Sequence, residues 1–138
     1  MLSISKLQIE LQNLKKEIND IMSDLLSYFY VKIYLISLFI VNIFIWLMSF
    51  FIDSRIDSDQ MALHYNVDFG IDYYGNKNLI YIIPVLGIMI SLINFCLLAT
   101  MSRSRDRRFI AHLLLASALI CNIILLTAQI SVYLINFW

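Results

Sequence analysis

Three long apolar runs divide this chain and constrain its fold more than any other feature. They extend over residues 29–52, 79–101 and 109–137, and each reaches the roughly 20 residues that a helix needs to cross a hydrocarbon core of about 30 Å. Inside a bilayer the backbone must satisfy its own hydrogen bonds, so runs of this length predict helices. The chain is 61% apolar and 14% charged, against about 45–50% and about 25% in soluble domains. We therefore expect an all-α integral membrane protein with three transmembrane helices.

Basic residues are distributed unevenly between the connections. Residues 102–108 contain four arginines, and the N-terminal part through Lys32 adds four lysines, whereas residues 53–78 contain only Arg55 and Lys77. The positive-inside rule then predicts a cytoplasmic N-terminus and arginine-rich connection, with residues 53–78 and the C-terminus outside. We expect a multi-pass protein of a bacterial inner membrane, with the first run acting as an uncleaved anchor. The arginines are interpreted as a topology determinant that contacts lipid phosphates.

Residues 1–28 carry a heptad pattern and predict a separate cytoplasmic amphipathic helix. Apolar residues recur there at alternating spacings of three and four. The members of the pattern are Ile4, Leu7, Leu11, Leu14, Ile18, Ile21 and Leu25, followed by Tyr28. In this register Glu10 occupies position g and Lys15 position e. Glu10 of one chain would therefore lie opposite Lys15 of a parallel neighbouring chain. We expect a homo-oligomer held together by a coiled coil through this helix.

An alternative interpretation places the same helix on the membrane surface or against its own protein. Ile9, Met22 and Leu26 widen the apolar stripe beyond the two heptad positions, as in helices that lie on a bilayer. The polar face argues against lipid, because Gln12 and Asn13 give no cationic surface for anionic headgroups. Both interpretations remain open at the level of sequence, and the number of subunits is not specified.

Four amide side chains interrupt the apolar runs, namely Asn42, Asn94, Asn122 and Gln129. An amide that faces lipid leaves donors and acceptors unpaired, so we expect each to face another helix. Gly87 and Ser91 form a small-xxx-small pair that allows helices to approach closely. The alternative is that Asn42 and Asn122 line a pore in an oligomer. The middle of each run lacks Asp, Glu, Lys and Arg, so the usual marks of a proton relay or ion-coupled transporter are missing.

The segment of residues 53–78 is acidic and rich in aromatic residues. Its aspartates do not follow the order of a calcium loop, and His64 has no second His or Cys at zinc spacing. A nucleophile beside a base is also missing from this segment. We expect a non-enzymatic protein without catalytic residues, metal ligands or cofactors. The formal net charge of zero provides no basic field for nucleic acid.

A motif in this segment resembles a known family. The matching residues are Asp59, Gln60, Leu63, His64, Tyr65, Asn66, Gly70, Asp72, Gly75 and Lys77, followed by Ile83 and Pro84. The motif is similar to a domain of unknown function in bacterial membrane proteins, which also occurs at the N-terminus of SdpI-type immunity and signalling proteins. Residues 36–138 resemble more closely a group of uncharacterised small bacterial three-span membrane proteins. The chain departs from the broader pattern with Ala62 in place of proline, and with Gly70 one position later.

The resemblance implies a structured, turn-rich loop that caps the helices. Its candidate residues for the cap or for recognition are His64, Tyr65, Asn66, Asp68, Gly70, Asp72 and Gly75. Asn66 or Asp68 is expected to accept local backbone hydrogen bonds, the two glycines to adopt positive φ, and His64 to be oriented by this network. The loop is either a self-satisfied cap or a surface that recognises a ligand or protein outside.

Three functions remain as hypotheses. The heptads favour a self-associating scaffold or assembly subunit. The resemblance favours an outer-face binding protein of immunity or signalling type, with an unidentified protein partner. The intramembrane amides favour an oligomeric pore. Each of the three places the chain in a lipid bilayer and needs no nucleic acid.

Overall fold

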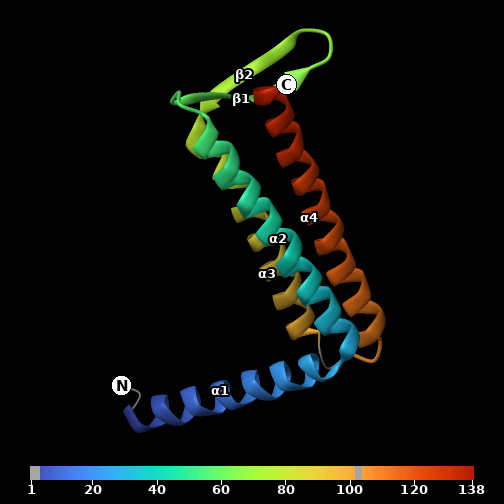
Figure 1. Cartoon of the computed structure of the whole chain (residues 1–138). Helices are drawn as coiled ribbons and strands as arrows, with labels where there is room; N and C mark the ends of the chain where they lie inside the picture. The colour runs from blue at the N-terminus through green and yellow to red at the C-terminus, as the bar shows by residue number, and fades with distance from the viewer. Residues whose placement is uncertain (1–3, 102–103) are drawn as a thin grey trace.

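A computed structural model of the chain describes residues 4–101 and 104–138, with side-chain surroundings from residue 6 onward. Its elements in order are α1 (Ile4–Ser27), α2 (Phe29–Arg55), β1 (Gln60–Asn66), β2 (Gly70–Asn76), η1 (Lys77–Tyr81), α3 (Ile82–Thr100) and α4 (Arg107–Phe137). Helices α2, α3 and α4 lie side by side as a bundle (Figure 1). Three helical stretches are long and apolar enough to cross a membrane: α2, η1 together with α3, and α4. The three expected spans are confirmed, with ends that differ from the expected ones by a few residues.

Helix α4 is the central packing partner of the bundle. It packs along both α2 and α3, while α2 and α3 contact each other less extensively. With 31 residues, α4 is about 46 Å long at 1.5 Å per residue. This exceeds a hydrocarbon core of about 30 Å, so α4 must tilt or project beyond it.

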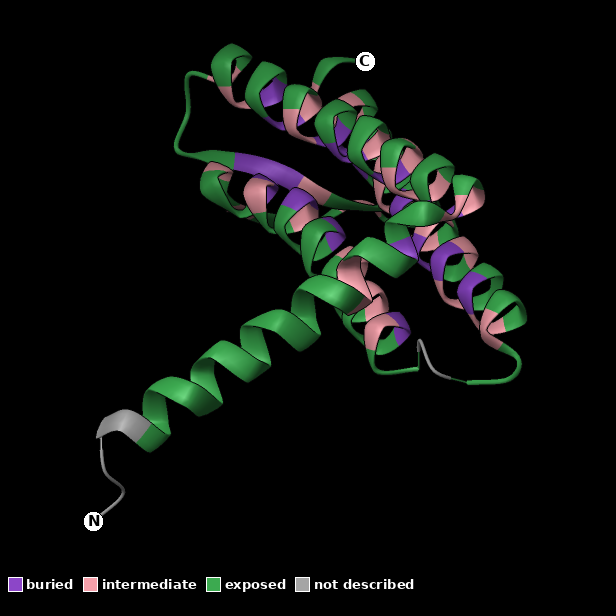
Figure 2. Ribbon diagram, turned by 90° about the horizontal axis from the view of Figure 1, so that it is seen from below, coloured by how far each residue is buried: buried purple, intermediate pink, exposed green. Residues whose placement is uncertain are grey.

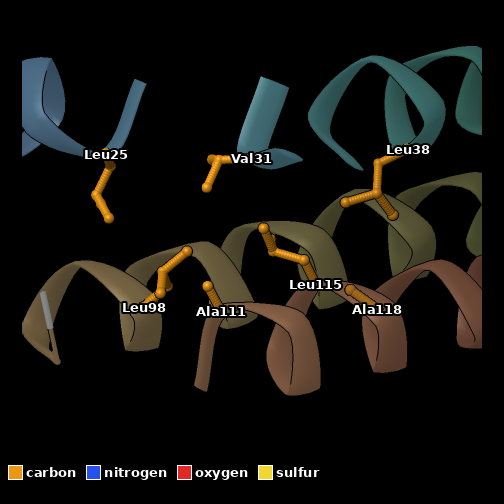
Figure 3. Close-up of a cluster of buried hydrophobic side chains, with 7 residues drawn as sticks. All are labelled: Leu25, Val31, Leu38, Leu98, Ala111, Leu115 and Ala118. Atoms are coloured by element: carbon orange, nitrogen blue, oxygen red, sulfur yellow. The ribbon is translucent and has the colours of Figure 1, made fainter. Parts of the chain in front are cut away.

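Buried apolar side chains form two clusters at opposite ends of the bundle. The first joins the end of α1 to α2, α3 and α4, and its side chains point toward one another in Figure 3. It consists of Leu25, Val31, Leu38, Leu98, Ala111, Leu115 and Ala118. The second lies beneath the strands and consists of Ile52, Met61, Ile80 and Val132. We call these two regions the α1 end and the hairpin end of the bundle.

Helix α1 leaves the bundle instead of extending α2. Tyr28 separates the two helices with an extended backbone, φ −82° and ψ 122°, and α1 then runs across the bundle axis (Figure 1). Most of α1 is exposed (Figure 2). Only its last turns are covered, where Leu25 is buried and Ile21 packs against the same cluster. Tyr28, the last member of the heptad pattern, therefore falls at a break. The side chain of Ile4 lies outside the described part.

The expected all-α membrane fold holds for the three spans, but the connection between the first two contains strands, which corrects the expectation of a loop made of turns. β1 and β2 form an antiparallel hairpin, pairing Gln60 with Asn76 and Asn66 with Gly70. The connection of three residues is followed by Gly70 at φ +78°, a usual solution for hairpins with a three-residue loop. The glycine and the polar residues were interpreted only as turn signals. In the structure, these residues form the turn that joins two hydrogen-bonded strands.

Candidate functional site

A layer of buried amides joins the three spans halfway along the bundle. Asn42 Nδ2 donates to Asn122 Oδ1 at 2.9 Å. Asn122 Nδ2 lies 2.9 Å from the carbonyl oxygen of Ala118 and 3.3 Å from that of Gly87. Its third neighbour is Ser91 Oγ at 3.2 Å. Asn42 is 8% exposed and Asn122 is fully buried, so the expected contact of these amides with neighbouring helices is confirmed.

Gly87 lets α3 approach this asparagine pair. A Cβ atom at position 87 would lie 2.5 Å from Asn42 Nδ2 and 2.7 Å from Asn122 Oδ1. Both distances are shorter than van der Waals contact, so a larger side chain at this position would push the pair apart. Ser91, one turn further on, donates to the carbonyl oxygen of Gly87 at 2.8 Å. The small-xxx-small pair thus brings the backbone of α3 against the amides of α2 and α4.

The other two amides also connect helices. Gln129 Nε2 donates to Ser49 Oγ at 3.1 Å, and both residues are fully buried between α4 and α2. Asn94 Nδ2 donates to the carbonyl oxygen of Ile90 at 2.9 Å, and Asn94 Oδ1 accepts from Ser117 of α4 at 3.4 Å. Within one protomer, these amides are therefore used in helix packing.

The candidate recognition residues lie along the hairpin. Asn66 Oδ1 accepts from the backbone N–H of Asp68 at 2.9 Å, which closes a local turn. His64 Nδ1 and Asp72 Oδ1 are 2.6 Å apart across the two strands. The positive φ expected of Gly70 is confirmed, but the same expectation for Gly75 is wrong. A Cβ atom at Gly75 would instead lie 2.5 Å from Leu63 Cδ1 and 3.0 Å from Leu79 Cδ1, so close packing is the constraint there.

The hairpin exposes its tip. Val67 is 88% exposed and Phe69 is 84% exposed, on either side of Asp68, and Tyr65 beside them is half exposed. The candidate residues do not converge on a concave site, and they do not line the cavity described below. The hairpin therefore presents its tip as a projecting, exposed surface.

Asn136 of α4 attaches the hairpin to the bundle, a contact that sequence reasoning missed. Its Oδ1 accepts from the backbone N–H of Ala62 at 3.0 Å, and its Nδ2 donates to the carbonyl oxygen of Ala62 at 2.7 Å. A proline at position 62 would lack the N–H for the first of these bonds. An amide at the end of the last span was the only signal in the sequence.

Arg107 ties α1 to α4 at the opposite end of the bundle. Its guanidinium bonds to the carboxylate of Asp24 and the hydroxyl of Tyr28, and its Cζ atom lies 4.6 Å from the centre of the Tyr28 ring. Beside it, His112 stacks on Tyr30 with ring centres 4.7 Å apart. A cavity of about 640 Å³ opens between α1 and the residues from Ser104 to Phe109. Sequence reasoning assigned the arginines only to topology and lipid contact.

Across the described ranges 4–101 and 104–138, no three His, Cys, Asp or Glu side chains gather where they could hold a metal ion. Comparison with protein-family models, curated protein sequences and solved structures gives no match for this chain. Its three apolar helices define it as a multi-pass helical membrane protein.

Proposed function

We propose that this chain is a non-enzymatic membrane protein that associates with copies of itself and serves as a scaffold or assembly subunit. The stripe on α1 carries this proposal. Leu7 and Leu14 are each 51% exposed, Leu11 is 58% exposed and Ile18 is 61% exposed. These four side chains share one face of a helix that the described chain leaves uncovered before its last turns. A second α1 helix would bury this stripe.

The charges beside the stripe favour a second copy over lipid. Glu10 and Lys15 flank the seam at positions g and e, so two parallel copies of α1 pair them between chains. The opposite face carries Gln12, Asn13, Asn19 and Asp20, so apart from Lys6 and Lys16 it offers little attraction to anionic headgroups. The break at Tyr28 presents α1 sideways from the bundle, within reach of a neighbouring protomer.

The proposed orientation follows the basic residues. The α1 end of the bundle, with Arg105, Arg107 and Arg108, faces the cytoplasm of a bacterial cell, and the hairpin end faces outward. In this orientation α1 lies along the cytoplasmic face of the inner membrane. Accessibility of a cysteine introduced at Asp68 to a membrane-impermeant reagent in whole cells tests the orientation, and labelling only after lysis contradicts it.

Disulfide crosslinking tests the proposed association. In a chain with Cys96 and Cys121 replaced by serine, Leu11→Cys places one thiol on the seam and Asn13→Cys places it on the opposite face. Oxidation in native membranes should give crosslinked dimers with the first variant and far fewer with the second. Equal yields from both positions, or monomers throughout, would reject the coiled-coil interface.

A charge exchange tests the pairing across the seam. Lys15→Glu should weaken association by about twofold, because exposed ion pairs contribute roughly 0.2–1 kcal/mol. Adding Glu10→Lys to the same chain should restore it. Energy transfer between labelled protomers, measured while the protein is diluted with lipid, reports both changes. Failure of the double variant to recover would argue against a specific parallel register.

Lipid could cover the apolar stripe of α1 in place of a second α1 helix. Fluorescence quenching distinguishes these two arrangements. Leu14→Trp, in a chain whose two native tryptophans are replaced by phenylalanine, reports contact with brominated acyl chains. Self-association predicts weak quenching that increases as the protein is diluted in the membrane. Strong quenching at every protein density would place α1 on the bilayer surface and overturn the proposed interface.

The exposed hairpin supports recognition on the outer face as a second candidate function. Val67 and Phe69 expose two apolar side chains at the tip, and the pairing of His64 with Asp72 holds the strands behind them. Combined alanine substitutions at His64, Asn66 and Asp72 should remove the cellular function while the protein still folds and reaches the membrane. Asp57→Ala, in the same segment before the hairpin, is the matched control. A triple variant that folds and supports normal growth would count against this candidate.

A further inference from the structure

The cavity of about 640 Å³ between α1 and the start of α4 has charges of both signs on its wall. Three aspartates and three arginines line it: Asp20 and Asp24 from α1, Arg105 and Asp106 from the turn before α4, and Arg107 and Arg108 from its first turn. Arg107 already pairs with Asp24. Within residues 4–101 and 104–138, no hydrogen bond or ion pair engages the side chains of Asp20, Arg105 or Arg108. Two guanidinium groups and a carboxylate are therefore available to a ligand.

The part of the cavity at the start of α4 suits a phosphate group. Arg105 and Arg108 line it, and guanidinium groups bind phosphate through pairs of N–H donors. The side chain of Asp106 makes no capping hydrogen bond to the first turn of α4, and the first N–H groups of a helix have no partner within the helix. These N–H groups and the positive end of the helix dipole add to the attraction for an anion.

The carboxylates on the same wall favour a ligand that also carries a cation. Because aspartates and arginines are equal in number there, a ligand with negative charge alone gains little from the net charge of the cavity. A phosphate with an ammonium group close to it matches both signs. A primary ammonium also gives the carboxylate of Asp20 charged N–H donors, whereas a trimethylated ammonium has no N–H to give.

The cavity continues onto an exposed apolar face of α4. Phe109 lines the cavity and is 70% exposed. Exposed apolar side chains follow it along the helix at spacings of four, seven and four residues, namely Leu113, Ile120 and Ile124. These spacings place the side chains on one face, and α4 is long and apolar enough to cross a membrane. Acyl chains joined to a bound headgroup can therefore lie along α4, which favours a lipid over a soluble phosphate compound.

We infer that this cavity binds the headgroup of a phospholipid that carries a primary amine, such as phosphatidylethanolamine. Its phosphate lies at Arg105, Arg108 and the start of α4, and its ammonium group lies at Asp20. Such a site selects one headgroup, which general contact between arginines and lipid phosphates does not. It is separate from the stripe on α1 and needs only that α4 crosses a membrane, whichever side this end of the bundle faces.

Native mass spectrometry of the full chain in detergent measures this selectivity. The protein is titrated with phosphatidylethanolamine, phosphatidylcholine and phosphatidylglycerol that have identical acyl chains, and the lipid bound per protomer is counted. Phosphatidylethanolamine should bind about threefold more tightly than either of the others, the change expected from one partly exposed ion pair. Soluble phosphoethanolamine at the same concentration should not displace it. Equal binding of the three lipids, or displacement by the soluble compound, would overturn the inference.

Two variants separate the two halves of the site. Asp20→Asn should abolish the preference by weakening phosphatidylethanolamine binding while phosphatidylglycerol binds at least as well as before. Arg105→Gln combined with Arg108→Gln should weaken all three lipids roughly tenfold, because each arginine contributes one ion pair to the phosphate. Asp57→Asn and Lys16→Gln, matched changes of exposed charges outside the cavity, should leave binding unchanged. A preference that survives Asp20→Asn, or unchanged affinity in the arginine variant, would reject the site when circular dichroism shows a folded protein.

Discussion

At the scale of single residues, Gly87 makes the most specific prediction. Gly87→Ala should reduce the free energy of unfolding by about 1–3 kcal/mol, since the added methyl group displaces the buried Asn42 and Asn122 amides. Denaturation of the purified protein in mixed micelles, followed by circular dichroism, measures the change. Gly75→Ala is the matched control, because its methyl group meets the ends of the flexible Leu63 and Leu79 side chains. A loss at position 87 no larger than at 75 would contradict the importance of the amide layer.

Asn136 makes a second prediction at this scale. Asn136→Leu removes both hydrogen bonds from the buried backbone of Ala62, whose unsatisfied groups cost about 1–3 kcal/mol. The hairpin should open more often, so the Ala62 amide proton should exchange at least about tenfold faster. Hydrogen exchange with mass spectrometry measures this rate. Thr127→Val on the exposed face of α4 should leave it unchanged, and unaltered protection in Asn136→Leu would show that other contacts hold the hairpin.

The surroundings of the four intramembrane amides could be predicted from the sequence, but those of Asn136 could not. The chemistry of a carboxamide in lipid was enough to predict that Asn42 and Asn122 would face other helices. It did not identify their mutual pairing, because partner and depth depend on how α2 and α4 pack. Asn136 is near an end of its span, where water is an equally good partner. Its bond to a strand edge could not be predicted before the strand itself was known.

At the scale of elements, the attachment of α1 can be tested through Arg107. Arg107→Ala removes the contacts to Asp24 and to the Tyr28 ring, worth roughly 0.5–2 kcal/mol together for partly exposed groups. Helix α1 should then move more freely relative to α4. Spin-label distances between α1 and α4 should broaden, and high salt should broaden them in the parent protein as well. Arg108→Ala next to it removes an exposed charge and should preserve the narrow distribution.

The sequence was enough to predict the transmembrane helices but not the hairpin. Each span is a continuous apolar run, so its length alone predicted the helix. The hairpin has neither a long β-branched run nor a strict alternation. Register shifts near His64 break the alternation of its strands. Met61 is buried in the second cluster, and Ala62 is bonded to Asn136 of α4. Tertiary contacts therefore decide where this strand lies.

At the scale of the whole molecule, the three-span architecture was predictable and the direction of α1 was not. The heptad pattern continues through Tyr28 toward α2 without a glycine or proline to mark a break. Nothing local in the sequence signals that the two helices separate there. Packing of Leu25 into the cluster at the α1 end, with the bond from Arg107 to Asp24, is what turns α1 aside. These contacts join residues about 80 positions apart.

The amide layer also has a consequence for how the protein is made. Asn42 and Ser49 enter the membrane with the first span, but Asn122 and Gln129, to which they bond, belong to α4, which is synthesised after the first two spans. During translation, Asn42 lacks its amide partner until α4 is made, whereas Ser49 already donates within α2 to the carbonyl oxygen of Ile45. A nascent chain stalled before α4 should therefore be held by insertion factors or degraded. Insertion of α4 is thus the step that commits the molecule to its folded state.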